Sequence, residues 1–285
     1  MAGAYWHFLA AIELIDQIHT IKDQHQGFAA ILQHKETFLA GVQGPDFNFY
    51  PGGDRKISLL SHEPNPADVG RALLNFAKTD REKAFAYGWL MHLTTDHITH
   101  PLVHTMMREH FYGKCRNGTD HSVYPLGHHR VEWGIDVFLL QEKSVYPLLP
   151  GLSEILPSAL DLATFANQAF KEVYDYPFTA TDWEGSIKGM IKYEEIFKVV
   201  WRLSGRFKDT NPIRQGLKDI LYHLLLTPIL KVAAIRTPDN GAGVFLPIKP
   251  TTADFERIRF HNERACKAFL LFIPENFAKL ENNVT

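Results

Sequence analysis

The sequence predicts an all-α protein that folds as a single compact multi-helix domain. Apolar residues recur every three to four positions through most of the 285 residues, and the alternating runs typical of strands are scarce. No internal repeat, low-complexity tract or shift in composition divides the chain. Hydrophobic residues make up 45% of it, which suffices for a large core. We therefore expect one domain over residues 1–285.

The first 110 residues or so of the chain are expected to form four helices. Residues 5–21 and 27–41 show helical spacing of apolar residues, whereas residues 41–56 contain GP and PGG and are expected to form a loop. Asn65 and Pro66 are typical of an N-cap and a first helical position. A long helix is predicted from Arg81 to about His110. Proline removes a backbone hydrogen bond, so we expect this helix to bend near Pro101.

The remainder of the chain is also expected to be helical. Residues 114–127 are predicted to be a loop and residues 128–141 a helix. Further helices are expected at about 153–174, 183–205, 213–232 and 251–282. Residues 236–250 are rich in glycine and proline, and we expect a long loop there that is able to cover a site as a lid.

Composition and charge exclude several classes of protein. The net charge of −2 and the pI near 6.7 offer no basic surface for long nucleic acid. Two distant cysteines without a CxxC pattern favour a reducing, cytoplasmic location. The N-terminal stretch lacks a basic start and contains Glu13 and Asp16, unlike a signal peptide. No run of ~18 uncharged apolar residues occurs, so no transmembrane segment is expected.

Histidines with helical spacing are the main chemical signal. Nine of the fifteen histidines lie between positions 62 and 129. The segment GWLMHLTTDHITHPLVH contains four residues spaced by four, which face one side of a helix: His92, Asp96, His100 and His104. The segment GHHRVEWGID repeats the pattern with His128 and Glu132. A lone helical histidine is usually a core or surface residue, but two such histidine–carboxylate pairs favour a site for zinc, or less well for iron or manganese.

Three further residues are candidates for the same site. His62, in LLSHEPNP, precedes a predicted helix and can close a site from a turn. Asp46, in GPDF, lies among apolar neighbours, where a carboxylate needs a partner such as a metal or its bound water, although an ordinary turn aspartate is the alternative. His7 lies in the first predicted helix, where a core histidine is the usual interpretation.

Together these segments resemble the zinc-dependent phospholipase C family, which is related to the S1/P1 nucleases and to the catalytic domain of glycosylphosphatidylinositol-specific phospholipase D. The resemblance covers roughly residues 4–140, and its elements occur in this order: WHFLAAIELIDQI, HKETFLAGVQGPDFNFYPGG, LLSHEP, GWLMHLTTDHITHP and HHRVEWGID. It implies the helical fold of these phospholipases and P1-type nucleases. It also implies a metal site built from residues 1–140, with residues 150–285 as helical completion.

The resemblance further implies two to three zinc ions. The first is expected on His62, His92 and Asp96, the second on His100, His128 and Glu132, and the third on His7 and Asp96, with Asp96 bridging two ions. Secreted bacterial members complete the third site with a processed N-terminal tryptophan, and in a chain that begins MAGAYWH this ligand is not expected in its usual form. The alternatives are Asp46, the processed terminus near Ala2, water, or an empty third site. These members also place a histidine six residues after the bridging aspartate, where this chain has Leu102. This leaves His100 or His104, and His100 matches the spacing in the phospholipase D relative.

The activity implied is hydrolysis of a phosphate ester, phospholipid-like or another phosphodiester, by a zinc-activated hydroxide. Asp46 is expected to orient that hydroxide or accept its proton. The expected substrate is a small-molecule or lipid-like phosphoester. Three aromatic residues follow Asp46 and are expected either to line the substrate pocket or to pack in the core: Phe47, Phe49 and Tyr50. Asp136 is expected either to orient an imidazole or to lie on a solvated helix face.

Three other functional classes stay open at this point. A repurposed metal-dependent enzyme would use zinc as a Lewis acid on the carbonyl of a non-phosphate metabolite. A nuclease like the S1/P1 enzymes would stack a base on the same aromatic residues. A purely structural zinc site would hold helices together, but such sites are usually rich in cysteine.

Overall fold

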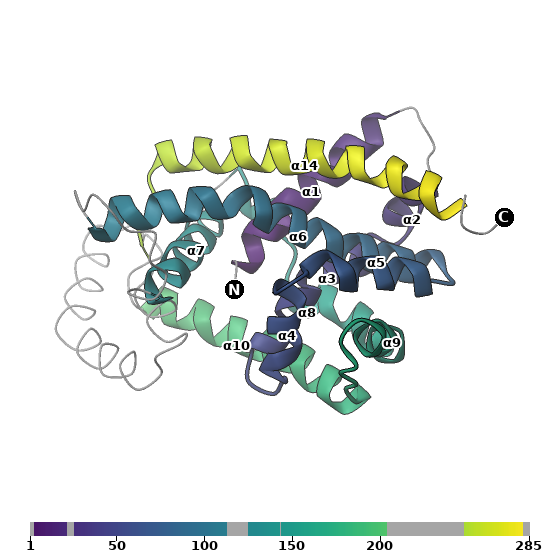
Figure 1. The fold of residues 1–285 in the computed structure, drawn as a ribbon. Helices are drawn as coiled ribbons and strands as arrows, with labels where there is room; N and C mark the ends of the chain where they lie inside the picture. The colour runs from purple at the N-terminus through teal and green to yellow at the C-terminus, as the bar shows by residue number, and fades with distance from the viewer. Residues whose placement is uncertain (1–2, 22–25, 113–124, 143, 204–247, 282–285) are drawn as a thin grey trace. The chain divides into compact units, whose positions relative to one another are not determined.

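The computed structural model describes residues 3–21, 26–112, 125–142, 144–203 and 248–281. In these ranges the chain forms α-helices, short 3-10 helices and one π-helical turn, and it forms no strand (Figure 1). The prediction of an all-α fold is therefore confirmed.

The chain divides into two compact units, and each is assembled from three separate stretches of sequence. Unit 1 comprises Met1–Trp6, Thr99–Leu149 and Glu194–Arg259, and unit 2 comprises His7–Ile98, Pro150–Tyr193 and Phe260–Thr285. Several unit boundaries fall inside helices, so no change of composition marks them. The single domain inferred from the sequence stays a prediction.

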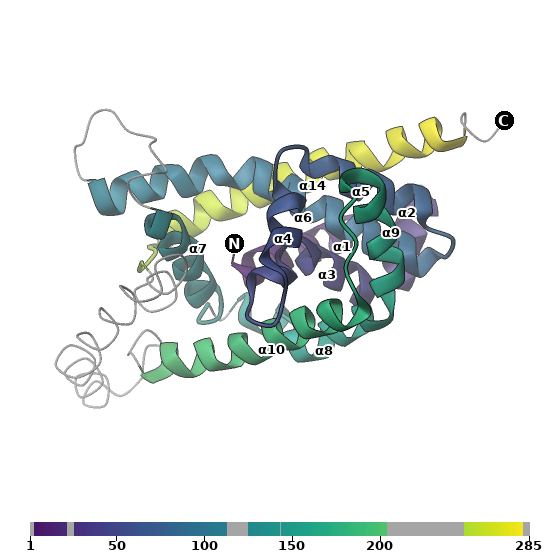
Figure 2. The same ribbon diagram turned by 60° about the horizontal axis from the view of Figure 1, so that its bottom comes forward.

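Unit 2 holds most of the described helices. Those that begin before residue 100 are α1 (Ala4–Thr20), α2 (Gln26–Gln33), α3 (Lys35–Gln43), α4 (Arg55–His62), α5 (Pro66–Phe76) and α6 (Asp80–Met107). The later ones are α8 (Leu152–Ile155), η4 (Leu156–Leu162), α9 (Ala163–Tyr174) and α10 (Ala180–Leu203), of which α10 continues into unit 1. Helix α5 packs against α9 (Figure 2). Helix α4 packs against the 3-10 helix η1 (Gly44–Phe49).

Two glycines bring α3 and α6 unusually close together. A Cβ atom added at Gly41 would collide with the carbonyl oxygen of Phe85, and one added at Gly88 would collide with the carbonyl oxygen of Phe38. The backbones therefore approach where neither residue has a side chain. This approach places the carbonyl of Val42 within reach of the side chains on the next turn of α6.

Several helix boundaries differ from the predictions. The helix expected over 27–41 is divided at His34, and the loop expected over 41–56 contains η1, which begins at Gly44 next to Pro45. The helix expected over 153–174 is a short α-helix, a 3-10 helix with proline in its first turn, and then α9. Helix α10 begins three residues early, because Thr179 and Asp182 cap its first turn through reciprocal hydrogen bonds of 2.9 and 3.1 Å.

Unit 1 contains α7 (Pro125–Leu139). Trp133 of α7 packs edge to face on Phe197, and Phe138 contacts Phe255 of α14 (Thr252–Glu281). The backbone N–H of Ile248 donates to the carbonyl of Arg130 at 2.8 Å. The predicted helix at 213–232 and nearly all of the 236–250 loop lie outside the described residues.

No helix within the described ranges combines the length and the apolar character that crossing a membrane requires.

Candidate metal centre

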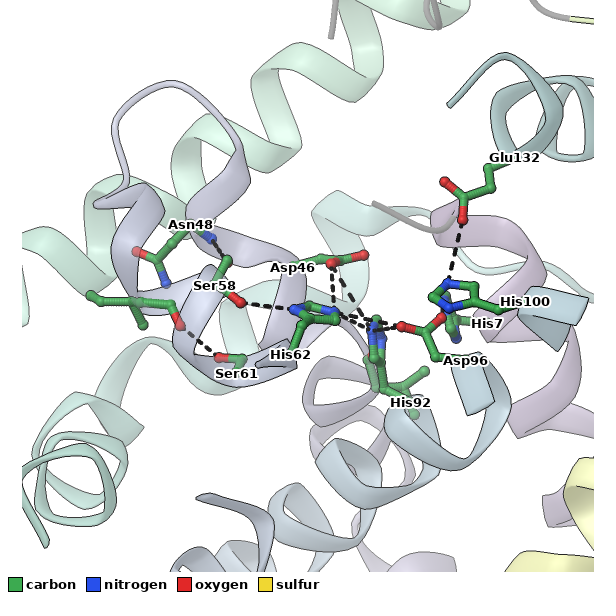
Figure 3. Close-up of polar contacts among 12 residues, drawn as sticks. His7, Asp46, Asn48, Ser58, Ser61, His62, His92, Asp96, His100 and Glu132 are labelled. Atoms are coloured by element: carbon green, nitrogen blue, oxygen red, sulfur yellow. Dashed lines mark hydrogen bonds and ion pairs between the residues drawn. The ribbon is translucent and has the colours of Figure 1, made fainter. Parts of the chain in front are cut away.

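Four helices of unit 2 bring together five of the residues singled out in the sequence. The contributors are His7 on α1, Asp46 on η1, His62 at the end of α4, and His92 and Asp96 one turn apart on α6. Figure 3 shows Asp46, His62, His92 and Asp96 directed toward one another from these separate elements. The i,i+4 spacing on α6 therefore places the imidazole of His92 and the carboxylate of Asp96 on one face, as the sequence predicts.

Backbone carbonyls orient two of the imidazoles. His92 Nδ1 lies 2.7 Å from the carbonyl oxygen of Val42, and His62 Nδ1 lies 2.8 Å from that of Ser58. A carbonyl can only accept, so each Nδ1 carries the proton and each Nε2 keeps its lone pair. The two Nε2 atoms lie 3.3 Å apart and face the same space.

Several distances among these candidate ligand atoms are close to those of a tetrahedral zinc site. Asp46 Oδ1 lies 3.5 Å from His62 Nε2 and 4.0 Å from His92 Nε2. Asp96 Oδ2 lies 3.5 Å from His62 Nε2 and 3.4 Å from His92 Nε2. Ligands about 2.0–2.1 Å from a tetrahedral zinc ion lie about 3.3–3.4 Å from one another. An ion would therefore fit between the two imidazoles and either carboxylate oxygen after small side-chain adjustments.

The second oxygen of Asp96 faces a different histidine. Asp96 Oδ1 lies 3.2 Å from His7 Nε2, and the His7 ring stacks on the His92 ring with centroids 4.0 Å apart. The two oxygens of one carboxylate thus face two sets of imidazoles. This is the arrangement expected of a carboxylate that bridges two cations.

Burial and charge in unit 2 suit a bound cation. His7, Asp46, His92 and Asp96 are all at least nine-tenths buried. Asp46 Oδ1 and His7 Nδ1 have no hydrogen-bond partner among the described residues, a costly state for buried polar atoms that a metal ion at Asp46 would relieve. Burial and the nearby His92 lower the pKa of His7, which keeps its ring in the neutral form that binds metal. Burial opposes protonation of His92, but the carboxylates of Asp96 and Asp46 outweigh it and raise the pKa of His92.

Unit 1 contains a separate group of three candidate ligands, His100 on α6 and His128 and Glu132 on α7. His128 Nε2 lies 2.7 Å from Glu132 Oε1, and His100 Nε2 lies 3.8 Å from the same oxygen. Glu132 is fully buried. Burial raises the pKa of this carboxyl, but the charge of His128 and hydrogen bonds from His128 and His129 hold it well below its usual range. The anionic form needed to bind a cation is therefore favoured.

The three aromatic residues after Asp46 occupy different environments. Phe47 is fully buried and packs edge to face on Trp183, and Tyr50 is also buried, so core packing is favoured for both. Phe49 is half-buried, and its ring centroid lies 5.5 Å from that of His62. Of these three, Phe49 is the side chain placed to meet a substrate.

Asp136 is not on a solvated face. It is fully buried, and its Oδ1 accepts a hydrogen bond of 3.0 Å from the backbone N–H of Trp6 in the first turn of α1. Burial and the nearby carboxylate of Glu194 raise the pKa of Asp136 well above its ordinary value. The expected contact of Asp136 with a ligand imidazole is replaced by this contact with the backbone.

The carbonyls of Val42 and Ser58 were not among the predicted site residues. They act through the backbone, and no residue type or spacing in the sequence indicates such a contact. Only the close approach of α3 to α6 and the last turn of α4 create them.

One family model and two curated relatives match the chain. The model of a family described as zinc-dependent phospholipase C matches residues 6–192. One protein of Archaeoglobus fulgidus, described as uncharacterized, is 28% identical over 120 residues, which is 42% of this chain and 37% of the relative. A second uncharacterized protein of that organism is 26% identical over 110 residues, which is 38% of this chain and 32% of the relative. The matches thus span only about a third of the length of these curated relatives.

No solved structure shows a significant match to the chain. The family model covers well over half of the 285 residues and includes the unit 2 group and the candidate ligands on α6 and α7. The chain belongs to the zinc-dependent phospholipase C family.

Proposed function

We propose that the protein is a zinc-dependent hydrolase that cleaves a phosphodiester, either phospholipid-like or a smaller metabolite. Asp46, His62, His92 and Asp96 would hold one ion, His7 and Asp96 would hold a second, and the unit 1 group would hold a third. The observation that carries this proposal is that five distances among the candidate ligand atoms of Asp46, His62, His92 and Asp96 lie between 3.3 and 4.0 Å. Membership of a zinc-dependent family supports the choice of metal.

The unit 2 residues provide metal ligands and also leave coordination positions for substrate. Bound zinc ions supply a water nucleophile that is activated near neutral pH and neutralise charge on phosphoryl oxygens. Asp46, His62 and His92 contribute one ligand atom each, and Asp96 contributes two. His7 and Asp96 together provide only two ligand atoms, which leaves coordination positions open to water and substrate. With Oδ1 directed at His62 and His92, Asp46 is assigned to metal binding first, and its second oxygen can orient water.

Phe49 provides the apolar contact in this proposal. It is half-buried beside the His62 ring and so lies at the edge of the unit 2 ligand group. An aromatic face there suits a cationic head group or another flat or apolar part of the substrate. Phe49→Ala should therefore change KM more than kcat.

Two chromogenic substrates test the activity. The zinc-loaded protein should hydrolyse bis-p-nitrophenyl phosphate or p-nitrophenylphosphorylcholine, and His92→Ala should abolish the turnover. Preference for the choline ester would indicate a phospholipid-like substrate. Protein that retains zinc but cleaves neither ester, nor single-stranded nucleic acid, would contradict a phosphodiesterase and leave carbonyl chemistry or a structural role.

Ser58 offers a test of how the unit 2 group is held in place. Its hydroxyl accepts a hydrogen bond of 3.0 Å from the backbone N–H of Asn48 on η1, and its carbonyl orients His62. Ser58→Ala removes the tie between the segments that carry Asp46 and His62. We expect zinc affinity to fall by about 10-fold, the lower end of the range for outer contacts of metal ligands.

Ser61→Ala is the matched control for Ser58→Ala. Ser61 is also fully buried on α4, but its hydroxyl donates to the carbonyl of Ile57 within the same helix at 2.8 Å. Competition with a zinc chelator measures both variants. Equal affinities in the two variants would show that the Asn48–Ser58 contact does not position the ligands.

A further inference from the structure

An open hollow of unit 2 lies at the start of α3, and its lining contains none of the candidate metal ligands. Its volume is about 540 Å³, within the range of small-molecule sites. The junction of α2 with α3, the first turn of α6 and the 3-10 helix η4 contribute to the lining. We propose that this hollow binds the phosphate group of a small phosphorylated molecule.

The first turn of α3 supplies backbone donors. His34 occupies the N-cap position, and its side chain makes no capping hydrogen bond. The N–H groups of Lys35, Glu36 and Thr37 begin the helix, and the first N–H groups of a helix have no acceptor within it. Such donors and the helix dipole together attract an anion.

The hydroxyl of Thr37 is a second and independent indication of a ligand. Thr37 lines the hollow although the residue is only 4% exposed. Its hydroxyl makes no hydrogen bond within the part of the chain that the structure describes. A polar group in such a buried position costs free energy unless it has a partner. An oxygen of a bound phosphate would accept a hydrogen bond from it.

Two cationic side chains also line the hollow. Arg81 donates to the two carboxylate oxygens of Asp161 at 2.6 Å each, and it donates to the carbonyl of Ser158. These contacts use three of the five N–H groups of a guanidinium and leave two for a ligand. Lys35 donates to His19 Nε2 at 3.0 Å, which leaves two of the three N–H groups of its ammonium.

This combination of donors favours phosphate over a carboxylate. Backbone N–H groups, a hydroxyl and a guanidinium can each meet a different oxygen, and a phosphate ester has three strong acceptor oxygens whereas a carboxylate has two. Glu36 is the carboxylate of the lining, but its side chain is exposed, so water screens its charge. The volume leaves space beside a phosphate group, which favours a phosphorylated molecule over the free ion.

Backbone amide NMR spectra of the zinc-loaded, full-length protein test the site directly. Inorganic phosphate and glycerol phosphate, titrated separately, should each shift the amide signals of Lys35, Glu36 and Thr37 in a saturable way, and the ester should bind at least as tightly as the ion. Thr37→Val keeps the shape of the side chain but removes the hydroxyl, and it should raise the Kd measured at these signals by about 10-fold or more. Thr37→Ser keeps a hydroxyl and should bind both probes nearly as the wild type does.

A pair of lysine variants tests the contribution of charge. Lys35→Gln should weaken the binding of both probes several-fold. Lys188→Gln is the matched control, because Lys188 pairs with Glu184 on α10 outside the hollow, and it should bind as the wild type does.

The site and the proposed hydrolase can fail separately. Shifts confined to the candidate zinc ligands, equal affinities in Thr37→Val and the wild type, or weaker binding of the ester than of the ion would overturn the site and leave the hydrolase intact. Saturable shifts at Lys35, Glu36 and Thr37 in a protein that contains no zinc would support the site and contradict the proposed function.

Discussion

Asp96→Asn is expected to remove more metal than any single histidine substitution and to lower phosphodiester hydrolysis by well over ~10²-fold. Asp96 directs one oxygen at His7 and the other at His62 and His92. Asparagine keeps the shape of the side chain but replaces one oxygen by an amide nitrogen and removes the negative charge that offsets two cations. Loss of an outer contact to a metal ligand already costs about 10–100-fold, so loss of a bridging ligand should cost more.

Elemental analysis and initial rates on the same preparations measure this effect. His62→Ala and His92→Ala provide the comparison for a single lost ligand. Asp68→Asn is the control for the chemical change itself, because Asp68 lies on α5 and pairs with Arg71 outside the ligand group. An Asp96→Asn protein with full metal content and full activity would show that Asp96 does not bridge.

Removal of metal is expected to abolish hydrolysis and to destabilise the fold. An ion that binds only the folded protein stabilises it by about 2.7 kcal/mol when its free concentration is 100 times Kd. Two ions would contribute about 5 kcal/mol, which corresponds to a shift of roughly 10 °C or more in Tm. Buried Asp46 and Asp96 would in addition lose the cation that compensates their charge.

Differential scanning calorimetry with and without a zinc chelator measures the shift. Added zinc should restore both Tm and hydrolysis, and added magnesium should restore neither, because the ligand set is rich in imidazole. An unchanged Tm after the metal has been removed would show that the buried ligand groups are stable without an ion.

Much of this architecture is encoded in local patterns that the sequence displays directly. The spacing of His92 and Asp96 on a predicted helix indicated a shared face, and the structure places both side chains in one group. Asn65 and Pro66 correctly marked the start of α5. The breaks at His34 and in η4 were missed, because apolar spacing continues through them and only the backbone changes its hydrogen bonding.

Contacts between distant segments could not be predicted from the sequence. Phe47 follows Asp46 and suggested a pocket residue, yet Trp183 encloses it in the core. Asp136 lies one turn after Glu132 and is a sequence candidate for orienting an imidazole, yet it accepts a hydrogen bond from the backbone N–H of Trp6. The assignment of Asp46 to the group with His62 and His92 depends on η1 lying against α4, which no local pattern indicates.

The most direct test of this account is a metal count on purified, full-length protein expressed with adequate zinc. Inductively coupled plasma mass spectrometry should find between about two and three equivalents of transition metal per chain, mainly zinc. Less than about half an equivalent would contradict the central claim that these buried histidines and carboxylates form a zinc centre.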